Sequence, residues 1–325
     1  MEFIGSGGDS IPGLLELPDA PPVAFSLFAH CFTCGKDIAA ASRISRALLR
    51  HDYAVMHFDF TGLGNSDGDF ANTNFSSNVQ DLIAAAQYLR SEHQAPSLLI
   101  GHSLGGTAVL NAASDVPECR GVVTIGSPAD AQHVSKQFPC GNGTINKEGQ
   151  AEVDLAGRKF VIKKQFIDDI KTTNTDQLVN LGKALLVMHS PIDSIVSFKE
   201  AERIFVAAKH PESFVSLGNA DHLLSRARDS EYVAVTIAAW ASRFIPSDRP
   251  AHVKTKSGEV FVTEKYRAFM LDVHSDTHHW AADEPTKVGG KKRRPRPIRA
   301  SFSLSGYLCR HDCTHVCRRK KMASR

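Results

Sequence analysis

The sequence lacks any long hydrophobic run, because no stretch approaches the roughly eighteen consecutive apolar residues of a membrane-spanning helix. The first thirteen residues, MEFIGSGGDSIPG, also lack a basic start followed by an apolar core, so we expect no secretory signal. From these two absences we predict a cytoplasmic protein that has no membrane partner.

Cysteine is sparse and unevenly placed, since three of the seven cysteines fall in the last seventeen residues. An odd number in this arrangement argues against a disulfide framework, so we expect reduced thiols. The C-x-x-C pair at 31–34 and the Cys/His series at 309–317 invite a metal or redox interpretation. The pair has no second ligand pair nearby, and the series does not have a standard zinc spacing. We therefore predict no metal site and no cofactor.

An excess of one sign of charge is confined to the end of the chain. The formal net charge is +3, but residues 291–325 hold twelve Lys or Arg and one acidic residue, Asp312. The rest of the chain carries 26 basic and 34 acidic residues, so the body of the protein is acidic. We expect 291–325 to be a solvated basic tail without regular structure. Non-specific nucleic-acid binding by this tail is the alternative, but we do not expect a nucleic-acid partner.

Short apolar runs alternate with amphipathic stretches through the first three quarters of the chain. The runs predict strands at 23–29, 53–60, 97–101, 121–127, 183–190 and 213–217. The amphipathic stretches predict helices at 37–50, 78–92, 105–113, 199–209 and 232–244. Strands this apolar are covered on both faces, as in a parallel sheet between two layers of helices. The alternation predicts an α/β fold with a mostly parallel, doubly wound sheet and right-handed crossovers.

The alternation is interrupted at about 129–182, where we expect a small lid insertion. This stretch contains a predicted hairpin at 151–166 and a polar helix at about 166–180. An insertion here would lie over the carboxyl edge of the sheet, where ligands bind in such folds. The alternative is a loop decoration that does not contact substrate.

The domain organisation follows from composition. We expect one domain at 1–245, containing the insertion, and a linker rich in Pro, Ser and charge at 246–258. At 259–290 the sequence predicts two strands of a hairpin, and the alternation of strands and helices does not resume before the basic tail.

One motif carries the chemistry. In LLIGHSLGGTAVL, at 98–110, a G-x-S-x-G pattern follows a predicted strand and opens a predicted helix. A sharp strand-to-helix turn of this kind raises a serine hydroxyl above the sheet, so we predict that Ser103 is a nucleophile. Gly101 and Gly105 permit the close approach of the backbone, and His102 supports the elbow. The alternative is a glycine-rich tight turn without catalytic function.

A serine nucleophile needs a base, and the base needs a carboxylate that orients it. In this fold the chain order is Ser, then acid, then His. Asp193 follows one predicted strand and His222 follows the next, so both belong to the same edge of the sheet as Ser103. Asp221 is the rival acid, but we expect its side chain to point elsewhere. We interpret His189, at a strand end, as a packed and hydrogen-bonded residue.

The anion that forms on the attacked carbonyl needs two backbone amides. The amide of Leu104 opens the helix after the nucleophile and supplies the first. The second would come from the loop HCFTCGKD, at 30–37, where we predict the amide of Phe32, with Cys31 as the alternative.

With these motifs in order, residues 1–245 resemble an α/β-hydrolase. More narrowly, the chain resembles bacterial fusions of an α/β-hydrolase to an OsmC-type domain, of which HHWAADEPTKVGG, at 278–290, is similar to the early part. The resemblance implies esterase-like hydrolysis of a small acyl compound without a cofactor. It ends after Gly290, where we interpret the chain as out of frame, and the truncated OsmC-like part implies no thiol peroxidase activity. OsmC-type domains usually dimerise, so a homodimer is also implied, although the truncation removes part of the expected interface.

The sequence therefore predicts a serine hydrolase that cleaves an ester or thioester of a small acyl group through an acyl-enzyme. The alternative is a non-catalytic stress-response or partner-binding module that keeps the hydrolase fold.

Overall fold

A computed structural model describes most of the chain. The described residues are 1–18, 21–30, 39–137, 139–155, 158–172, 178, 181–209, 211–246, 257, 259–264, 270–275, 279–283 and 315–318. By contacts between residues, the chain divides into two units, the first formed by Met1–Leu17 with Pro22–Ser247 and the second by Pro18–Pro21 with Asp248–Arg325.

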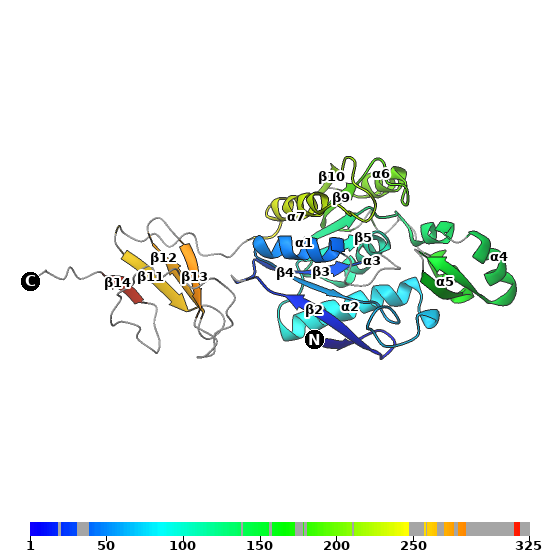
Figure 1. The fold of residues 1–325 in the computed structure, drawn as a ribbon, viewed down its shortest axis with the longest axis horizontal. Coiled ribbons are helices and arrows are strands. Elements are labelled where there is room, and N and C mark those ends of the chain that lie inside the picture. Colours follow the sequence, from blue (N-terminus) through cyan, green and yellow to red (C-terminus); the bar gives the residue numbers. More distant parts are fainter. Residues whose placement is uncertain are drawn as a thin grey trace, which may run out of the picture. The chain divides into compact units, whose positions relative to one another are not determined.

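The first unit is built on an eight-stranded sheet with the strand order β1-β2-β4-β3-β5-β6-β9-β10 (Figure 1). Its strands are β1 (Glu2–Ile4), β2 (Ser10–Glu16), β3 (Ala24–Ala29), β4 (Tyr53–Phe58), β5 (Leu98–His102), β6 (Gly121–Ile125), β9 (Ala184–His189) and β10 (Glu212–Ser216). The six strands from β4 to β10 are parallel, while β1 and β2 form an antiparallel edge. The predicted mostly parallel α/β sheet is confirmed, whereas the antiparallel edge formed by β1 and β2 was not predicted.

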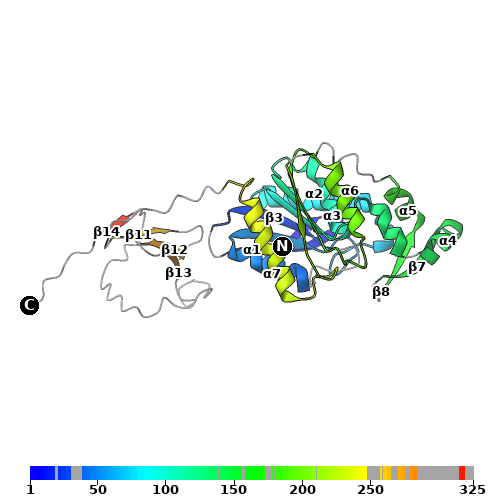
Figure 2. The same cartoon turned by 90° about the horizontal axis from the view of Figure 1, so that it is seen from above.

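Helices cover both faces of this sheet (Figure 2). They are α1 (Ala39–Arg50) and α7 (Ala227–Ala241) on one face, and α2 (Phe75–Glu92), α3 (Leu104–Ala112) and α6 (Phe198–Ala207) on the other. The apolar strands serve both layers because successive side chains point to opposite faces. In β3, Leu27 packs in the layer of α2 and α3, whereas Phe28 packs in the layer of α1 and α7.

The strand order also fixes where a ligand can bind. The chain goes from β3 to β4 on one side and later returns to place β5 on the other side of β3. This reversal opens a crevice at the carboxyl ends of β3 and β5, which is where open α/β sheets bind ligands.

Between β6 and β9 the chain forms an insertion. It contains a 3₁₀ helix η3 (Ala131–Gln137), α4 (Pro139–Glu148), β7 (Gln150–Leu155), β8 (Arg158–Lys163) and α5 (Lys164–Ile170). The antiparallel pair β7–β8 is the hairpin predicted at 151–166. The helix predicted at 166–180 is wrong in its extent, because α5 ends at Ile170. Only Phe166, Ile167 and Ile170 give this helix a buried face, and the polar residues that follow offer nothing to extend it.

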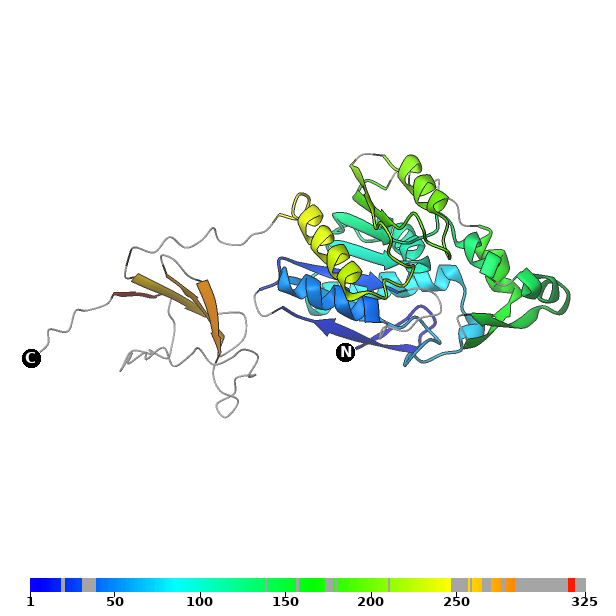
Figure 3. The ribbon, with the colours of Figure 1, turned by 45° about the horizontal axis from the view of Figure 1, so that its top comes forward.

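The insertion is attached to the first turn of α2 and to η1 (Phe70–Asn72), the short helix before it (Figure 3). The Asp169 carboxylate accepts hydrogen bonds from the Ser76 amide at 2.8 Å and from the Ser76 hydroxyl at 2.6 Å. The rings of Phe70 and Phe160 pack with their centroids 4.9 Å apart. A carboxylate from α5 therefore caps α2 from outside its own chain segment, which ties the two elements together.

The second unit contains an antiparallel sheet with the strand order β13-β12-β11-β14. Its strands are β11 (Glu259–Glu264), β12 (Met270–His274), β13 (His279–Asp283) and β14 (His315–Arg318). Three strands therefore precede residue 290, where the sequence predicts two. The fourth, β14, falls in the segment 291–325, for which the sequence predicts no regular structure. β14 pairs with β11 on the side opposite β12, so backbone N–H and C=O groups on that side of β11 have partners in β14.

Candidate active site

Ser103 alone makes the turn from β5 to α3. Its φ of 55° and ψ of −128° lie in a region that non-glycine residues rarely adopt. The turn brings backbone segments so close together that only glycine fits at the positions on either side of it. A Cβ on Gly101 would lie 2.3 Å from the Gly105 carbonyl oxygen, and a Cβ on Gly105 would lie 2.4 Å from that of Ala29. Such strain persists only where the surrounding structure imposes it, and it is typical of functional sites.

The structure brings the side chains of Ser103, His222 and Asp193 into one hydrogen-bonded row. The Ser103 Oγ lies 3.0 Å from the His222 Nε2, and the His222 Nδ1 lies 2.7 Å from the Asp193 Oδ2. Asp193 lies in the turn after β9, where its amide donates to the Ser190 carbonyl, and His222 lies in the turn after β10. The carboxyl ends of β5, β9 and β10 therefore supply the row, and β6 lies between β5 and β9 in the sheet.

Asp193 is held as a carboxylate in this row. Its Oδ1 accepts hydrogen bonds from the amides of Ile195 and Val196, at 2.8 and 2.9 Å, while its Oδ2 accepts from His222. Burial is the largest single effect and by itself would raise the pKa of Asp193. The hydrogen bond and charge of His222 and the two amides outweigh burial, so the pKa is lowered. Because an ionised carboxylate oxygen only accepts, the His222 proton that faces it lies on Nδ1, and the Nε2 faces the Ser103 hydroxyl.

His102 supports His222 through its ring, whose centroid lies 5.2 Å from that of the His222 ring, and through a bond to the His222 main chain. Its Nε2 lies 2.7 Å from the His222 carbonyl oxygen, to which it donates. Burial, reinforced by the nearby imidazole of His222, lowers the pKa of His102 to about 4. The ring is therefore neutral near pH 7 and positions His222 through a hydrogen bond to its main chain.

The two rival residues have other partners. His189 is fully buried, and its Nε2 donates to the Val196 carbonyl at 2.9 Å, with Asp193 Oδ2 further away at 3.8 Å. Burial also lowers the pKa of His189. Asp221 accepts hydrogen bonds from the Ser225 amide and hydroxyl, so its side chain points away from the row.

The amides expected to bind the oxyanion are described only in part. Leu104 is the first residue of α3, so its amide is one of those that have no acceptor within the helix. Phe32 and Cys31 lie outside the described residues. His30, just before them, is buried at the end of β3, with its Nε2 3.6 Å from the Asp59 carboxylate. Because Gly105 packs directly against the His30 carbonyl, the end of β3 and the start of α3 lie side by side.

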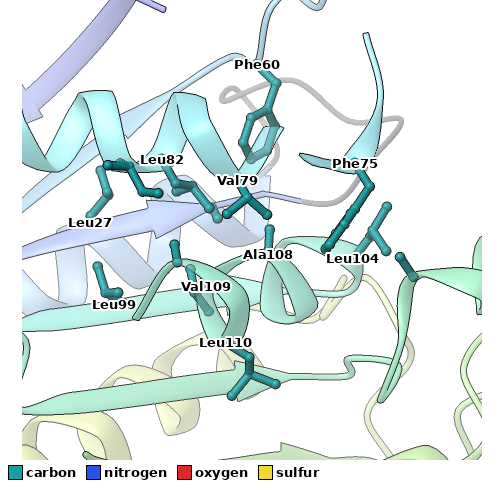
Figure 4. Packing of buried hydrophobic residues seen from close by; sticks show 14 of the residues in the cluster. Leu27, Phe60, Phe75, Val79, Leu82, Leu99, Leu104, Ala108, Val109 and Leu110 are labelled. Atoms are coloured by element: carbon teal, nitrogen blue, oxygen red, sulfur yellow. The ribbon is translucent and has the colours of Figure 1, made fainter. Parts of the chain in front are cut away.

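A pocket that the sequence does not predict adjoins this edge of the sheet. It encloses about 200 Å³, part of which is open to solvent. Figure 4 shows Phe60, Phe75, Leu104 and Ala108 gathered around the same space. Its lining residues are His30, Phe60, Phe75, Asn78, Leu104, Gly105 and Ala108.

One feature of the sequence could have pointed to this pocket. Asn78 follows Phe75 by three positions and precedes Leu82 by four, so it lies on the apolar face of an amphipathic helix. A polar residue on such a face is a sign of a hydrogen-bonding task inside the protein.

Neither a membrane span nor a metal cluster occurs in the described ranges. None of the helices there combines the length and hydropathy needed to cross a bilayer, and no three or more His, Cys, Asp or Glu side chains there are grouped as metal ligands.

Several known proteins are similar to this chain in sequence, in fold or in both. Residues 31–146 match the family model described as serine aminopeptidase, S33. The chain is 28% identical over 217 residues to the mitochondrial palmitoyl-protein thioesterase ABHD10 of Rattus norvegicus, covering 62% of this chain and 69% of the relative. The Mus musculus protein of the same name is 30% identical over 199 residues, covering 57% and 64%.

A solved structure is closer in sequence. The esterase domain of a Rhodothermus marinus protein is 47% identical, covers 75% of this chain and 98% of its own, and superposes with a TM-score of 0.63. The structure of mouse α/β hydrolase domain-containing protein 10, at 18% identity and a TM-score of 0.62, shares the fold. The strained serine turn, the mostly parallel sheet and these similarities lead to one conclusion: the chain belongs to the α/β-hydrolase family and is a serine hydrolase of that fold.

Proposed function

We propose that the chain hydrolyses an ester or thioester of a small acyl group through an acyl-enzyme on Ser103. The observation that carries the proposal is the 3.0 Å approach of the His222 Nε2 to the Ser103 Oγ, with the other ring nitrogen bound to Asp193. A serine hydroxyl is a weak nucleophile at neutral pH, and an adjacent oriented base activates it.

In the proposed reaction the Ser103 oxygen attacks the acyl carbonyl while its proton passes to the His222 Nε2. Asp193 stabilises the imidazolium that forms, and the amides of Leu104 and Phe32 bind the oxyanion. The proton then passes to the leaving alcohol or thiol as its bond to the acyl carbon breaks. In the second half, His222 takes a proton from water, which attacks the acyl-enzyme and releases the carboxylic acid and Ser103.

The relatives support an acyl substrate of this kind. One is a thioesterase by name and another is an esterase domain, so both leaving atoms, sulfur and oxygen, occur among proteins similar to this one. The buried, hydrogen-bonded Asp193 supports the proposed role of His222 as the base, because a paired carboxylate orients a catalytic imidazole.

The test compares wild type with Ser103→Ala on p-nitrophenyl acetate and on an acetyl thioester of N-acetylcysteamine. We expect kcat/KM to fall by about 10³-fold or more in the variant. Ser127→Ala is the matched control, since Ser127 is a buried serine beside the turn whose hydroxyl bonds the Ile125 carbonyl. Activity that survives in Ser103→Ala would contradict the nucleophile. If folded wild type cleaves neither probe, a non-catalytic or partner-binding module becomes the better account.

Three further features belong to the proposal. The insertion at 129–182 acts as a lid, supported by its attachment to the helix that carries Phe75. Residues 259–290 are the remnant of an OsmC-like domain, supported by HHWAADEPTKVGG, and the residues after Gly290 are read out of frame. The protein acts in the cytoplasm, as a monomer or a homodimer, without a nucleic-acid partner. Sequencing of the gene tests the frame, because a single-base shift must restore an apolar helix with a cysteine.

A further inference from the structure

A histidine of the insertion bonds the turn that carries Asp193. His133 lies on η3, is 7% exposed, and has its Nε2 3.2 Å from the Ile195 carbonyl oxygen. A carbonyl oxygen only accepts, so the Nε2 carries a proton and donates it to this bond. The contact joins the start of the insertion to the turn after β9, and the proposed reaction does not yet use it.

The carbonyl that His133 bonds belongs to a peptide group that also holds the acid. The Ile195 carbonyl and the Val196 N–H are the two ends of one planar peptide group. That N–H donates to the Asp193 Oδ1 at 2.9 Å, and the other carboxylate oxygen accepts from His222 at 2.7 Å. A bond on the carbonyl sets the direction of the N–H and polarises it, which strengthens its own hydrogen bond. Hydrogen bonds thus run without a break from His133 through this peptide group to Asp193 and His222.

The segment that carries His133 is fixed in turn by α6. Glu200 is buried on that helix and accepts hydrogen bonds from the Ala129 amide at 3.1 Å and from Arg203 at 2.8 Å. The Arg203 guanidinium also binds Asp130, at 2.7 Å. The second oxygen of Glu200 lies 3.9 Å from the His133 Nδ1. The imidazole is therefore held from behind by a helix that follows the turn it supports.

The next carbonyl of the turn is bonded in the same way by a residue of the sheet. The His189 Nε2 donates to the Val196 carbonyl at 2.9 Å, and His189 is the last residue of β9. Two imidazoles therefore hold successive carbonyls of the turn, one from the strand before it and one from the insertion. His133 is the member of this pair that makes the geometry of Asp193 depend on the insertion.

We propose that His133 is a positioning residue, through which the insertion holds the Asp193 carboxylate toward His222. The inference rests on the proposed function, since the row that His133 supports is the proposed catalytic row. His133 acts through the Val196 amide and not on the reacting atoms. Without its bond the turn can rotate the carboxylate away from the imidazole, so both halves of the reaction slow down while substrate binding is kept.

The turnover test measures kcat and KM on p-nitrophenyl acetate for the full chain and two variants. His133→Leu removes the donor, and kcat should fall by about tenfold with KM within about twofold of wild type, because misplacement of a reacting group by about 1 Å costs up to about 10²-fold. His133→Gln keeps an N–H donor at similar reach, so kcat should return to within about threefold of wild type. His133→Ala replaces the leucine variant if that variant does not fold.

Gln132→Leu is the matched control. Gln132 precedes His133 on η3, and its side-chain amide donates to the Lys171 carbonyl at 3.4 Å, within the insertion. Its loss loosens the same segment without a bond to the turn of Asp193, so kcat should stay at the wild-type value. A kcat in His133→Leu within about twofold of wild type overturns the proposal. So does an equal loss in Gln132→Leu, or a glutamine variant of His133 that is as slow as the leucine variant.

A spectroscopic measurement separates this inference from the proposed function, because it needs no turnover. In Ser103→Ala with isotope-labelled histidine, the proton between the His222 Nδ1 and the Asp193 carboxylate gives a strongly deshielded signal, which is assigned by its loss in His222→Gln. We expect this signal to move upfield or broaden in His133→Leu in the same background, and to stay in Gln132→Leu. If the signal moves but wild type cleaves no ester, the positioning stands and the proposed function fails. If wild type is active and the signal is unchanged in His133→Leu, the proposed function stands and His133 has no part in holding the acid.

Discussion

Replacing Asp193 by asparagine tests the row through a single atom. In the native site one carboxylate oxygen accepts from the amides of Ile195 and Val196 and the other accepts from His222. An asparagine has one oxygen and one NH₂ group. Facing its oxygen to the two amides keeps two hydrogen bonds, whereas the flipped side chain loses both. At about 0.5–1.5 kcal/mol for each bond, the first orientation is favoured by roughly 1–3 kcal/mol.

That orientation points the NH₂ group at the His222 Nδ1. Since an NH₂ group only donates, the Nδ1 must accept, and the ring proton moves to the Nε2, which then faces the Ser103 Oγ. The base can no longer take the serine proton. Loss of the correct tautomer costs about 10⁴-fold in kcat in serine hydrolases with such a row, which corresponds to about 5.4 kcal/mol of barrier.

The assay is kcat on p-nitrophenyl acetate for wild type and Asp193→Asn, with circular dichroism to show that the fold is kept. Asp221→Asn is the control, because Asp221 is next to His222 in sequence but bonds Ser225. We expect it to stay within about threefold of wild type. The reasoning is refuted if Asp193→Asn keeps more than a tenth of the activity, or if Asp221→Asn loses as much.

Three other perturbations test the supports of the site. Gly101→Ala should destabilise the protein by about 3 kcal/mol or more in urea unfolding, because its Cβ would lie 2.3 Å from a backbone oxygen; a loss below 1 kcal/mol would contradict the close approach. Burial lowers the pKa of His102 from 6.5 to about 4, so the unfolded chain binds a proton there before the native state does. Stability should therefore fall by up to roughly 3 kcal/mol as the pH drops from 6.5 to 4, and His102→Gln should lose less over the same range; equal losses would assign the effect to other groups. Asp169→Ala removes two hydrogen bonds to Ser76 and, at about 1 kcal/mol, should raise the rate of limited proteolysis in the insertion roughly fivefold. Asp168→Ala is the control. Asp168 is the neighbouring residue, and in the described residues its carboxylate pairs with Lys171 within the same segment, so the proteolysis rate should stay near the wild-type value.

Much of the sheet could be predicted from sequence because its strands are apolar enough to be buried on both faces. The strands around Leu27 and Ile100 need no context for that inference. The order of Ser103, Asp193 and His222 could also be predicted, because each follows a strand and parallel strands end at one edge. The three residues lie within hydrogen-bonding distance as a result.

Other parts depend on contacts that no local pattern encodes. The strand β2, second from the edge, contains Pro12 and alternates weakly, and it becomes a strand by pairing with β1 and β4. The helix α4 begins PCGNG, which has little intrinsic helical propensity, so its existence depends on tertiary context. The pocket depends on Phe60 and Asn78 meeting Leu104 across different elements, and their sequence spacing gives no measure of that meeting.

The attachment of the insertion to α2 has a consequence for how such a protein can diversify. The hydrogen-bonded row lies on turns after β5, β9 and β10, whereas a wall of the pocket lies on the first turn of α2, which Asp169 binds. Exchange of the insertion with that of a relative would reshape the wall while leaving the strands that carry the row in place. If the proposed function holds, a chimera made at the borders of β6 and β9 that retains His133 would change acyl preference without replacing any residue of the row.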